Sequence, residues 1–161
     1  MHQELRFDLE VLENESLLND DDRHLILLAR ETTANAYAPY SGFKVAAAGR
    51  LKDGTIVTGT NQENASYPVG ICAERTLLSA IASLYPNAPV DTIAITYHNA
   101  GGDSSKPIAP CGICRQSLLE YENRTKSPIR LLLTGYTGKV IIIEKASSLL
   151  PLSFSADDMQ R

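Results

Sequence analysis

Apolar positions along the chain follow a helical spacing in three segments. The first begins at the acidic run 20–22, which is typical of a helix N-terminus, and continues through apolar positions at 25–36. We expect this helix to end before Pro39, because proline cannot continue a helix. The second predicted helix covers residues 72–83, and the third covers residues 112–121.

Short runs rich in branched residues predict five strands. They lie at residues 43–48, 55–60, 90–97, 129–134 and 140–143. The turn sequence Lys52-Asp53-Gly54 predicts a hairpin between the first two strands, and residues 135–138 are short enough to join the last two in the same way. Both pairs are therefore expected to be antiparallel, and a short helix at 146–149 is expected to stop before Pro151.

The alternation of helices and strands predicts an α/β fold. We expect a three-layer α/β/α sandwich with a mixed five-stranded sheet, formed by residues 1–161 as one domain. Residues 1–15 show no single period, so we interpret them as an N-terminal arm that is either ordered or frayed.

Composition and charge narrow the possible partners. Hydrophobic residues make up 43% of the 161 residues, and no apolar run approaches the roughly 20 residues that cross a bilayer. The formal net charge of −4 argues against a nucleic-acid partner, because phosphate backbones are bound by basic surfaces. We expect a cytoplasmic protein with a small neutral substrate and no membrane partner.

All three cysteines of the chain lie in two short motifs. Cys72 belongs to Gly70-Ile71-Cys72-Ala73-Glu74-Arg75, and Cys111 and Cys114 belong to Pro110-Cys111-Gly112-Ile113-Cys114-Arg115-Gln116. An odd number of cysteines does not form a closed disulfide framework, whereas thiols three residues apart can bind one ion from a single helical turn. Three protein ligands leave a fourth position for water, so the motifs predict a catalytic zinc site.

Two charged residues follow the first ligand. Glu74 is the candidate general acid/base, because it can face the metal-bound water without binding the metal. The simpler alternative is a first-turn glutamate that interacts with the helix dipole. Arg75 is the candidate that offsets the net negative charge of zinc held by three thiolates, with a solvated surface arginine as its alternative.

Five segments, in this order, resemble the cytidine deaminases of the small, three-cysteine, homotetrameric class. They are Tyr37–Val45, Asn61–Pro68, the two cysteine motifs and Leu149–Phe154. A lone Pro-Cys-x-x-Cys would be a weak signal, whereas five matches in the same order are specific. The combination of three cysteines and a non-ligand glutamate is itself typical of zinc deaminases.

This resemblance implies a fold, a cofactor and a reaction. The implied cofactor is one zinc ion per chain, and the implied assembly is a homotetramer with sites completed by neighbouring subunits. The implied reaction is the hydrolysis of cytidine and 2′-deoxycytidine to uridine and 2′-deoxyuridine plus ammonia, as in pyrimidine salvage. Glu74 then carries protons from the attacking water to ring nitrogen N3 and to the leaving ammonia.

The resemblance also assigns contacts to the nucleoside. Asn61 and Glu63 resemble the pair that hydrogen-bonds the ribose, and Phe43 resembles the aromatic residue that packs on the pyrimidine. Ala73, between the first ligand and Glu74, is assigned to the same pocket. The alternatives are a turn residue for Asn61 and a core strand residue for Phe43.

Tyr67 and Phe154 resemble residues that neighbouring subunits contribute to a site, and ordinary core packing is the alternative for both. Three segments depart from the family pattern. They are the N-terminal arm, the loop at 98–107, which we expect to be exposed and mobile, and residues 46–49.

Two other functions compete with this interpretation. One is a different zinc deaminase of the same fold, acting on an aminonucleoside antibiotic, a free base or a polynucleotide. The other is a non-catalytic module in which zinc only stabilises the fold. Glu74 discriminates against the second, because a structural zinc site has no use for an acid/base beside an open position.

Overall fold

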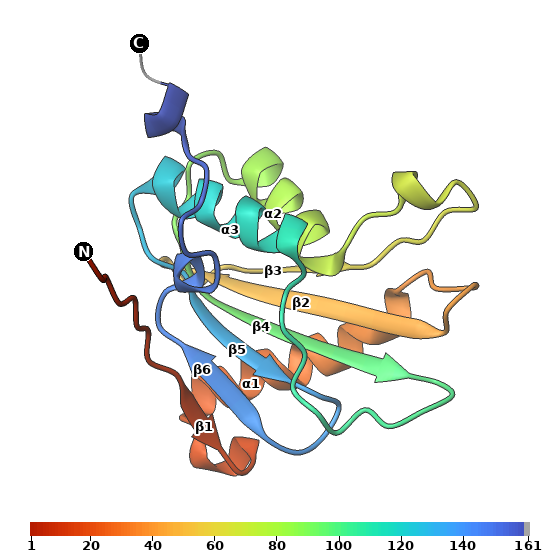
Figure 1. The fold of residues 1–161 in the computed structure, drawn as a ribbon. Coiled ribbons are helices and arrows are strands. Elements are labelled where there is room, and N and C mark those ends of the chain that lie inside the picture. Colours follow the sequence, from red (N-terminus) through yellow and green to blue (C-terminus); the bar gives the residue numbers. More distant parts are fainter. Residues whose placement is uncertain (160–161) are drawn as a thin grey trace.

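The computed structural model describes residues 1–159, which form one mixed sheet with helices on both faces (Figure 1). The strands are β1 (Glu10–Leu12), β2 (Phe43–Leu51), β3 (Ile56–Thr60), β4 (Val90–Asn99), β5 (Arg130–Thr134) and β6 (Val140–Ile143). The α-helices are α1 (Asp20–Thr32), α2 (Ala73–Leu84) and α3 (Gly112–Thr125). Short 3-10 helices lie at Glu15–Leu17, Thr33–Asn35, Tyr67–Val69, Ala146–Leu149 and Ala156–Met159.

The strand order across the sheet is β1-β6-β5-β4-β2-β3. Only β4 and β5 pair in parallel among these strands, because the connection between them contains α3 and returns the chain to the same end of the sheet. The predicted hairpins β2–β3 and β5–β6 are both antiparallel. Gly54 and Gly138 in their turns have φ values of 89° and 88°, which glycine adopts without a Cβ penalty.

Two clusters of buried side chains lie on the two faces of the sheet, so the predicted three-layer sandwich is confirmed. Figure 1 shows α1 on one face and α2 with α3 on the other. Neighbouring residues of one strand serve opposite faces, as the pleat requires. Ile93 and Leu131 pack with α2 and α3, whereas Ala94 and Leu132 pack with α1.

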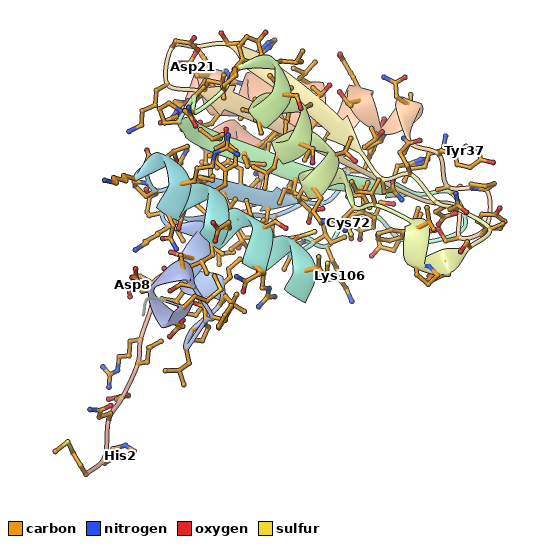
Figure 2. The ribbon with its side chains drawn as sticks, turned by 90° about the horizontal axis from the view of Figure 1, so that it is seen from above. His2, Asp8, Asp21, Tyr37, Cys72 and Lys106 are labelled. Carbon is orange, nitrogen blue, oxygen red and sulfur yellow. The ribbon has the colours of Figure 1, made fainter. Side chains whose placement is uncertain are left out.

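The sheet has six strands, so the prediction of five was wrong. The strand that was not predicted is the N-terminal one, β1. Residues Glu10–Leu12 pair antiparallel with β6, with Val11 opposite Ile141. The strand escaped prediction because three residues carry no periodic signal, and the open edge of β6 supplies the pairing partner. The first residues of the arm extend away from the body, with His2 near its end (Figure 2). The first helix ends before Pro39, as predicted: α1 stops at Thr32, and a 3-10 turn follows it to Asn35.

A glycine in β3 sets the distance between α2 and the sheet. A Cβ at Gly59 would lie 2.4 Å from the backbone nitrogen of Leu77 and 2.7 Å from the carbonyl oxygen of Ala73. The first two turns of α2 therefore lie directly on the strand backbone, where any other residue would push them away. This contact fixes the N-terminus of α2, which lies within the first cysteine motif.

The loop at 98–107 is mostly exposed, as predicted, and it is also hydrogen-bonded to its surroundings. Ser104 accepts from the backbone nitrogen of Tyr136 at 2.6 Å, and its hydroxyl accepts from the nitrogen of Asn99 at 2.9 Å. The hydroxyl of Tyr97 donates to the carbonyl of Asp103 at 3.4 Å. These bonds hold the loop against the β5–β6 turn before the chain enters the second cysteine motif.

No helix among residues 1–159 is long and apolar enough to span a bilayer.

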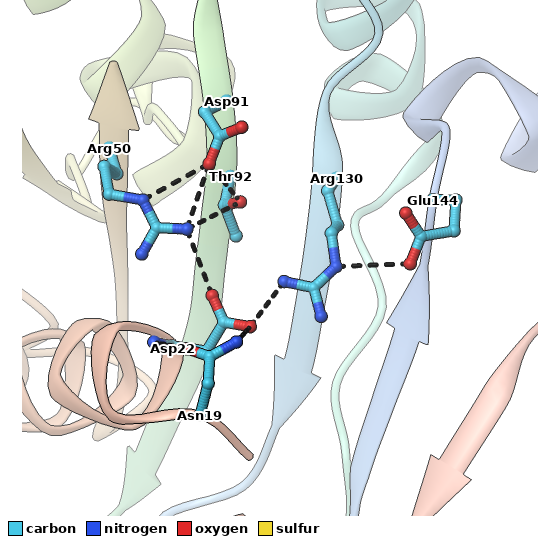
Figure 3. A network of polar contacts seen from close by, with 7 residues as sticks. All are labelled: Asn19, Asp22, Arg50, Asp91, Thr92, Arg130 and Glu144. Carbon is cyan, nitrogen blue, oxygen red and sulfur yellow. Dashed lines mark hydrogen bonds and ion pairs between the residues drawn. The ribbon is translucent and has the colours of Figure 1, made fainter. Parts of the chain in front are cut away.

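A buried carboxylate joins α1 to the sheet (Figure 3). Asp22 is fully buried and accepts from Arg50 on β2 at 3.1 Å and from Arg130 on β5 at 2.6 Å. The side chain of Asn19, which caps α1, donates to the same carboxylate at 2.9 Å. Both arginine side chains are partly buried, and their other acidic partners, Asp91 for Arg50 and Glu144 for Arg130, are more exposed, so Asp22 is the buried charge that balances both.

We predict that Asp22→Asn destabilises the protein by about 2 kcal/mol or more, because it removes the one fully buried carboxylate of the network and leaves Arg50 and Arg130 with only their more exposed partners, Asp91 and Glu144. Equilibrium unfolding in urea measures this change. Asp21→Asn is the matched control, since Asp21 is exposed on the same helical turn, and its cost should stay below about 1 kcal/mol. Equal effects of the two substitutions would contradict the role of the network.

Candidate metal centre and active site

The three thiols converge at the N-termini of two neighbouring helices. Cys72 is the N-cap residue of α2, Cys111 is the N-cap residue of α3, and Cys114 lies in the first turn of α3. The sulfur atoms of Cys72 and Cys111 are 3.8 Å apart, and those of Cys111 and Cys114 are 3.5 Å apart. Neither cap side chain accepts a capping hydrogen bond from the backbone of its own helix, so both thiols remain available as ligands.

The electrostatics of the cluster favour a cation. A hydrogen bond from Cys114 lowers the pKa of Cys72 to about 6. The same bond, together with burial, raises the pKa of Cys114 above its ordinary value. The cluster therefore accepts one negative charge readily and resists a second, unless a positive ion lies between the sulfurs.

The donor set fits zinc. The sulfur atoms of Cys72, Cys111 and Cys114 all lie within 4.8 Å of one another, and no histidine or carboxylate of residues 1–159 joins the group at this distance. Thiolates are soft ligands that zinc binds well, and three protein ligands leave one position of a tetrahedral site to water. Helix N-termini add further stabilisation for the thiolates.

Glu74 lies beside the thiols without belonging to their group. It is the second residue of α2 and is only 5% exposed. Burial raises the pKa of its carboxyl above the ordinary value for glutamate. A carboxyl with a raised pKa can give and take protons closer to neutral pH, which is what a general acid/base requires.

A cavity of about 300 Å³ opens beside Glu74, at the small end of the range for small-molecule sites. Five of the residues assigned from the sequence to the substrate or the reaction line it. They are Asn61, Glu63, Tyr67, Ala73 and Glu74, and the metal-ligand candidates Cys72 and Cys111 line it too. The structure thus brings together residues from the β3–α2 segment and the second cysteine motif in a single hollow.

Two polar residues that line this cavity are hydrogen-bonded to nearby backbone groups. The amide of Asn61 accepts from the nitrogen of Val45 at 2.7 Å and donates to the carbonyl of Phe43 at 2.9 Å. The carboxylate of Glu63 accepts from the nitrogen of Tyr40 at 2.9 Å and from the hydroxyl of Ser41. That hydroxyl is the main cause of a pKa of Glu63 below the ordinary value, so the group stays charged.

Asn61 and Glu63 still have hydrogen-bonding capacity for a ligand. An amide offers two donors and two lone pairs, and a carboxylate has about four acceptor sites, of which these contacts use only some. The sequence did not show that both side chains would also fix the start of β2.

Besides the buried ligand candidate Cys114, three residues assigned from the sequence do not line the cavity of this chain. Phe43 stacks on Tyr97, with ring centroids 4.7 Å apart, and does not line the hollow. Phe154 is 60% exposed near the C-terminus. Arg75 lines a groove between α2 and α3, and donates no hydrogen bond to a thiol within residues 1–159. The charge of Arg75 also lowers the pKa of Cys72, but by less than the hydrogen bonds with Cys114 and Cys111 do.

The sequence analysis missed several residues that line the cavity. Val45 follows Phe43 by two residues, so the strand period that places one on this face places the other there too. Gln62 and Ile71 exchange two backbone hydrogen bonds of 3.0 Å, which close the loop between β3 and α2. Ile108 and Ala109 precede the second motif, and no local pattern marks them as lining residues.

A three-thiol centre with a buried glutamate beside it, on an α/β/α sandwich, defines the class of zinc-dependent deaminases. Comparison with known proteins agrees. Residues 19–127 match the family model described as the cytidine and deoxycytidylate deaminase zinc-binding region. The chain belongs to this family.

Relatives and solved structures support the assignment. A cytidine deaminase of Halalkalibacterium halodurans is 38% identical over 139 residues, which cover 86% of this chain and 98% of the relative. A cytidine deaminase of Mycobacterium tuberculosis is 35% identical over 136 residues, which cover 83% and 89%. The crystal structure of a cytidine deaminase from Burkholderia pseudomallei superposes with a TM-score of 0.72 at 37% identity, covering 85% of this chain and all of that one.

We predict that each of the substitutions Cys72→Ala, Cys111→Ala and Cys114→Ala removes most of the bound zinc. The unaltered chain should carry one zinc ion per chain, because the site needs all three thiolates, and loss of one should weaken binding by about 100-fold or more. Inductively coupled plasma mass spectrometry of desalted protein measures the content. A full equivalent of zinc in any of the three variants would remove that cysteine from the ligand set.

Proposed function

We propose that the chain deaminates cytidine and 2′-deoxycytidine hydrolytically, giving uridine or 2′-deoxyuridine and ammonia. The observation that carries the proposal is the placement of buried Glu74 in a nucleoside-sized hollow, two residues after a candidate zinc ligand. The relatives named cytidine deaminase support the choice of nucleoside. Zinc, when bound to Cys72, Cys111 and Cys114, supplies a water that is acidic enough to attack near neutral pH.

Glu74 moves the protons of the reaction. It accepts a proton from the attacking water and delivers it to ring nitrogen N3, while the water oxygen bonds to C4. It then takes the second proton from the hydroxyl now on C4 and delivers it to the amino group, the C4–N bond breaks, the C4 carbonyl forms, and ammonia leaves. The sum is one water consumed and one ammonia released. Burial of Glu74 excludes bulk water, which keeps these transfers between the carboxyl and the substrate.

Asn61 and Glu63 are the proposed contacts to the sugar hydroxyls, and Ala73 contributes to the wall near the base. All three line the cavity. The carboxylate of Glu63 stays ionised, since Ser41 and the backbone of Tyr40 donate to it. A negative charge at this end of the site opposes a 5′-phosphate, whereas it accepts a hydrogen bond from a hydroxyl.

We propose that the protein assembles as a homotetramer with active sites completed by neighbouring subunits. Tyr67 is 84% exposed and Phe154 is 60% exposed, so ordinary core packing within this chain does not account for either. Phe43 is proposed to contact the pyrimidine. Because its ring stacks on Tyr97, only the part of the ring that Tyr97 leaves uncovered can make this contact. Arg75 is proposed to offset the negative charge of the thiolates from the α2–α3 groove.

The cellular location, the excluded partners and the domain organisation are also proposals. Reduced thiols that bind zinc suit a cytoplasmic location, and the net charge of −4 suits neither nucleic acid nor a membrane surface as partner. We treat the chain as one catalytic domain. A deaminase for another aminonucleoside or a free base is the nearest rival, and a non-catalytic zinc module is the more distant one.

We predict that cytidine and 2′-deoxycytidine release ammonia with a kcat/KM at least about 100-fold higher than cytosine or cytidine 5′-monophosphate, because the site discriminates through the sugar hydroxyls and Glu63. A parallel ammonia assay of the four compounds measures this. Glu63→Gln keeps the shape of the side chain and removes its charge. It should therefore reduce the difference in kcat/KM between cytidine and its monophosphate.

The other outcomes of this assay identify the rivals. Fastest turnover of cytosine would assign the chain to free bases, and comparable turnover of cytidine and its monophosphate would contradict the sugar contacts. No ammonia from any compound, with zinc fully bound, would favour a deaminase for another substrate or a structural metal site.

A further inference from the structure

The C-terminal segment 151–156 is held to the body by very little. It follows the 3-10 helix Ala146–Leu149 and runs past α3 (Figure 1). Leu152 is 99% exposed and has a φ of 54°, a value that costs energy for a residue with a Cβ. The segment belongs to no strand, so neither a sheet ladder nor burial of Leu152 fixes the position of Phe154.

One side chain supplies the missing anchor. The amide nitrogen of Gln116 on α3 donates to the carbonyl oxygen of Phe154 at 2.9 Å. Within residues 1–159, this is the only hydrogen bond that joins residues 151–156 to the chain before them. Gln116 belongs to the second cysteine motif, and the sequence alone gives it no role.

The preceding residue strengthens the same connection. Arg115 donates to the carbonyl of Leu149 at 3.0 Å, and to the carbonyl of Pro110, directly before the ligand Cys111, at 2.8 Å. Two consecutive residues of α3 therefore bind backbone carbonyls at both ends of the segment 149–154. The helical turn that presents Cys114 to the metal site also sets where the C-terminal segment lies.

We propose that Gln116 is a positioning residue that fixes Phe154 so that its ring can enter the nucleoside site of a neighbouring subunit. This inference rests on the proposed function, in which Phe154 completes that site. Gln116 does not touch the substrate; it restricts the freedom of the segment that carries the ring. Restricting a segment before binding removes part of the ordering cost that the substrate otherwise has to offset.

Loss of the Gln116 anchor should weaken substrate binding and leave the rate of the chemical step unchanged. Methionine has nearly the length of glutamine but no hydrogen-bond donor, so Gln116→Met removes the anchor and keeps the helix. We expect KM for cytidine to rise about three- to tenfold, which corresponds to one lost hydrogen bond. The value of kcat should stay within about twofold, because Glu74 and the thiols are unchanged.

A direct readout of the segment accompanies the kinetics. Hydrogen–deuterium exchange of the peptide that covers residues 150–156 should be faster in Gln116→Met than in the unaltered tetramer. Ser117→Ala is the matched control, because among residues 1–159 the hydroxyl of Ser117 bonds only the carbonyl of Ile113, within the same helix. In the control both KM and exchange should remain as in the unaltered protein.

A double-mutant cycle with Phe154→Ala decides whether Gln116 acts through the ring. If it does, Gln116→Met adds no further rise in KM once Phe154 is alanine. An unchanged KM in Gln116→Met, or the same rise in both backgrounds, would overturn the inference. An unchanged KM in Phe154→Ala alone would overturn both the inference and the proposed role of Phe154, while deamination itself is judged separately by the four-substrate assay.

Co-assembly of two impaired chains tests the neighbouring subunit. Mixed tetramers of Glu74→Ala and Phe154→Ala chains contain sites with intact Glu74 from one chain and intact Phe154 from another. Their activity should exceed the average of the parents. If mass measurement shows mixed tetramers without such a gain, Phe154 acts within its own chain and the cross-subunit part of the inference is wrong.

Discussion

The site depends on the convergence of two helix N-termini on one face of the sheet. Cys72 and Cys111 both cap their helices, and their sulfur atoms meet at 3.8 Å although 39 positions separate them along the chain. Gly59 allows α2 to lie directly on β3. The parallel pair β4–β5 requires a crossover, and α3 within it lies beside α2.

The convergence concentrates acidic groups at a partly buried site, in which Cys114 and Glu74 are buried and Cys111 is exposed. Cys72 ionises readily while burial and hydrogen bonding oppose ionisation of Cys114, and buried Glu74 adds a third acidic group. A divalent cation relieves this conflict, so the same arrangement that makes the metal-free cluster unfavourable makes zinc binding strong. The raised pKa of Glu74 follows from the same burial, which links metal binding and proton transfer to one structural cause.

The sequence predicted the residues of the metal site better than the structural elements around that site. Cysteine spacing and the position of Glu74 are local signals, and the structure brings those residues together. The edge strand β1 was missed because its pairing depends on the open side of β6 rather than on a pattern within the arm. Strand periodicity gives a shared face for Phe43 and Val45, but only the fold shows that Tyr97 covers Phe43. The bond from Gln116 to Phe154 spans 38 positions and has no local signature.

The central claim is that Glu74 transfers protons beside a metal that it does not bind. The most direct test measures bound zinc and the rate of cytidine deamination in the same preparation of Glu74→Gln. We expect a full equivalent of zinc per chain with kcat reduced by about 10²- to 10⁴-fold or more, because the amide keeps the shape of the carboxyl but cannot exchange the proton. Unchanged kcat with zinc bound, or loss of zinc from this variant, would contradict the account.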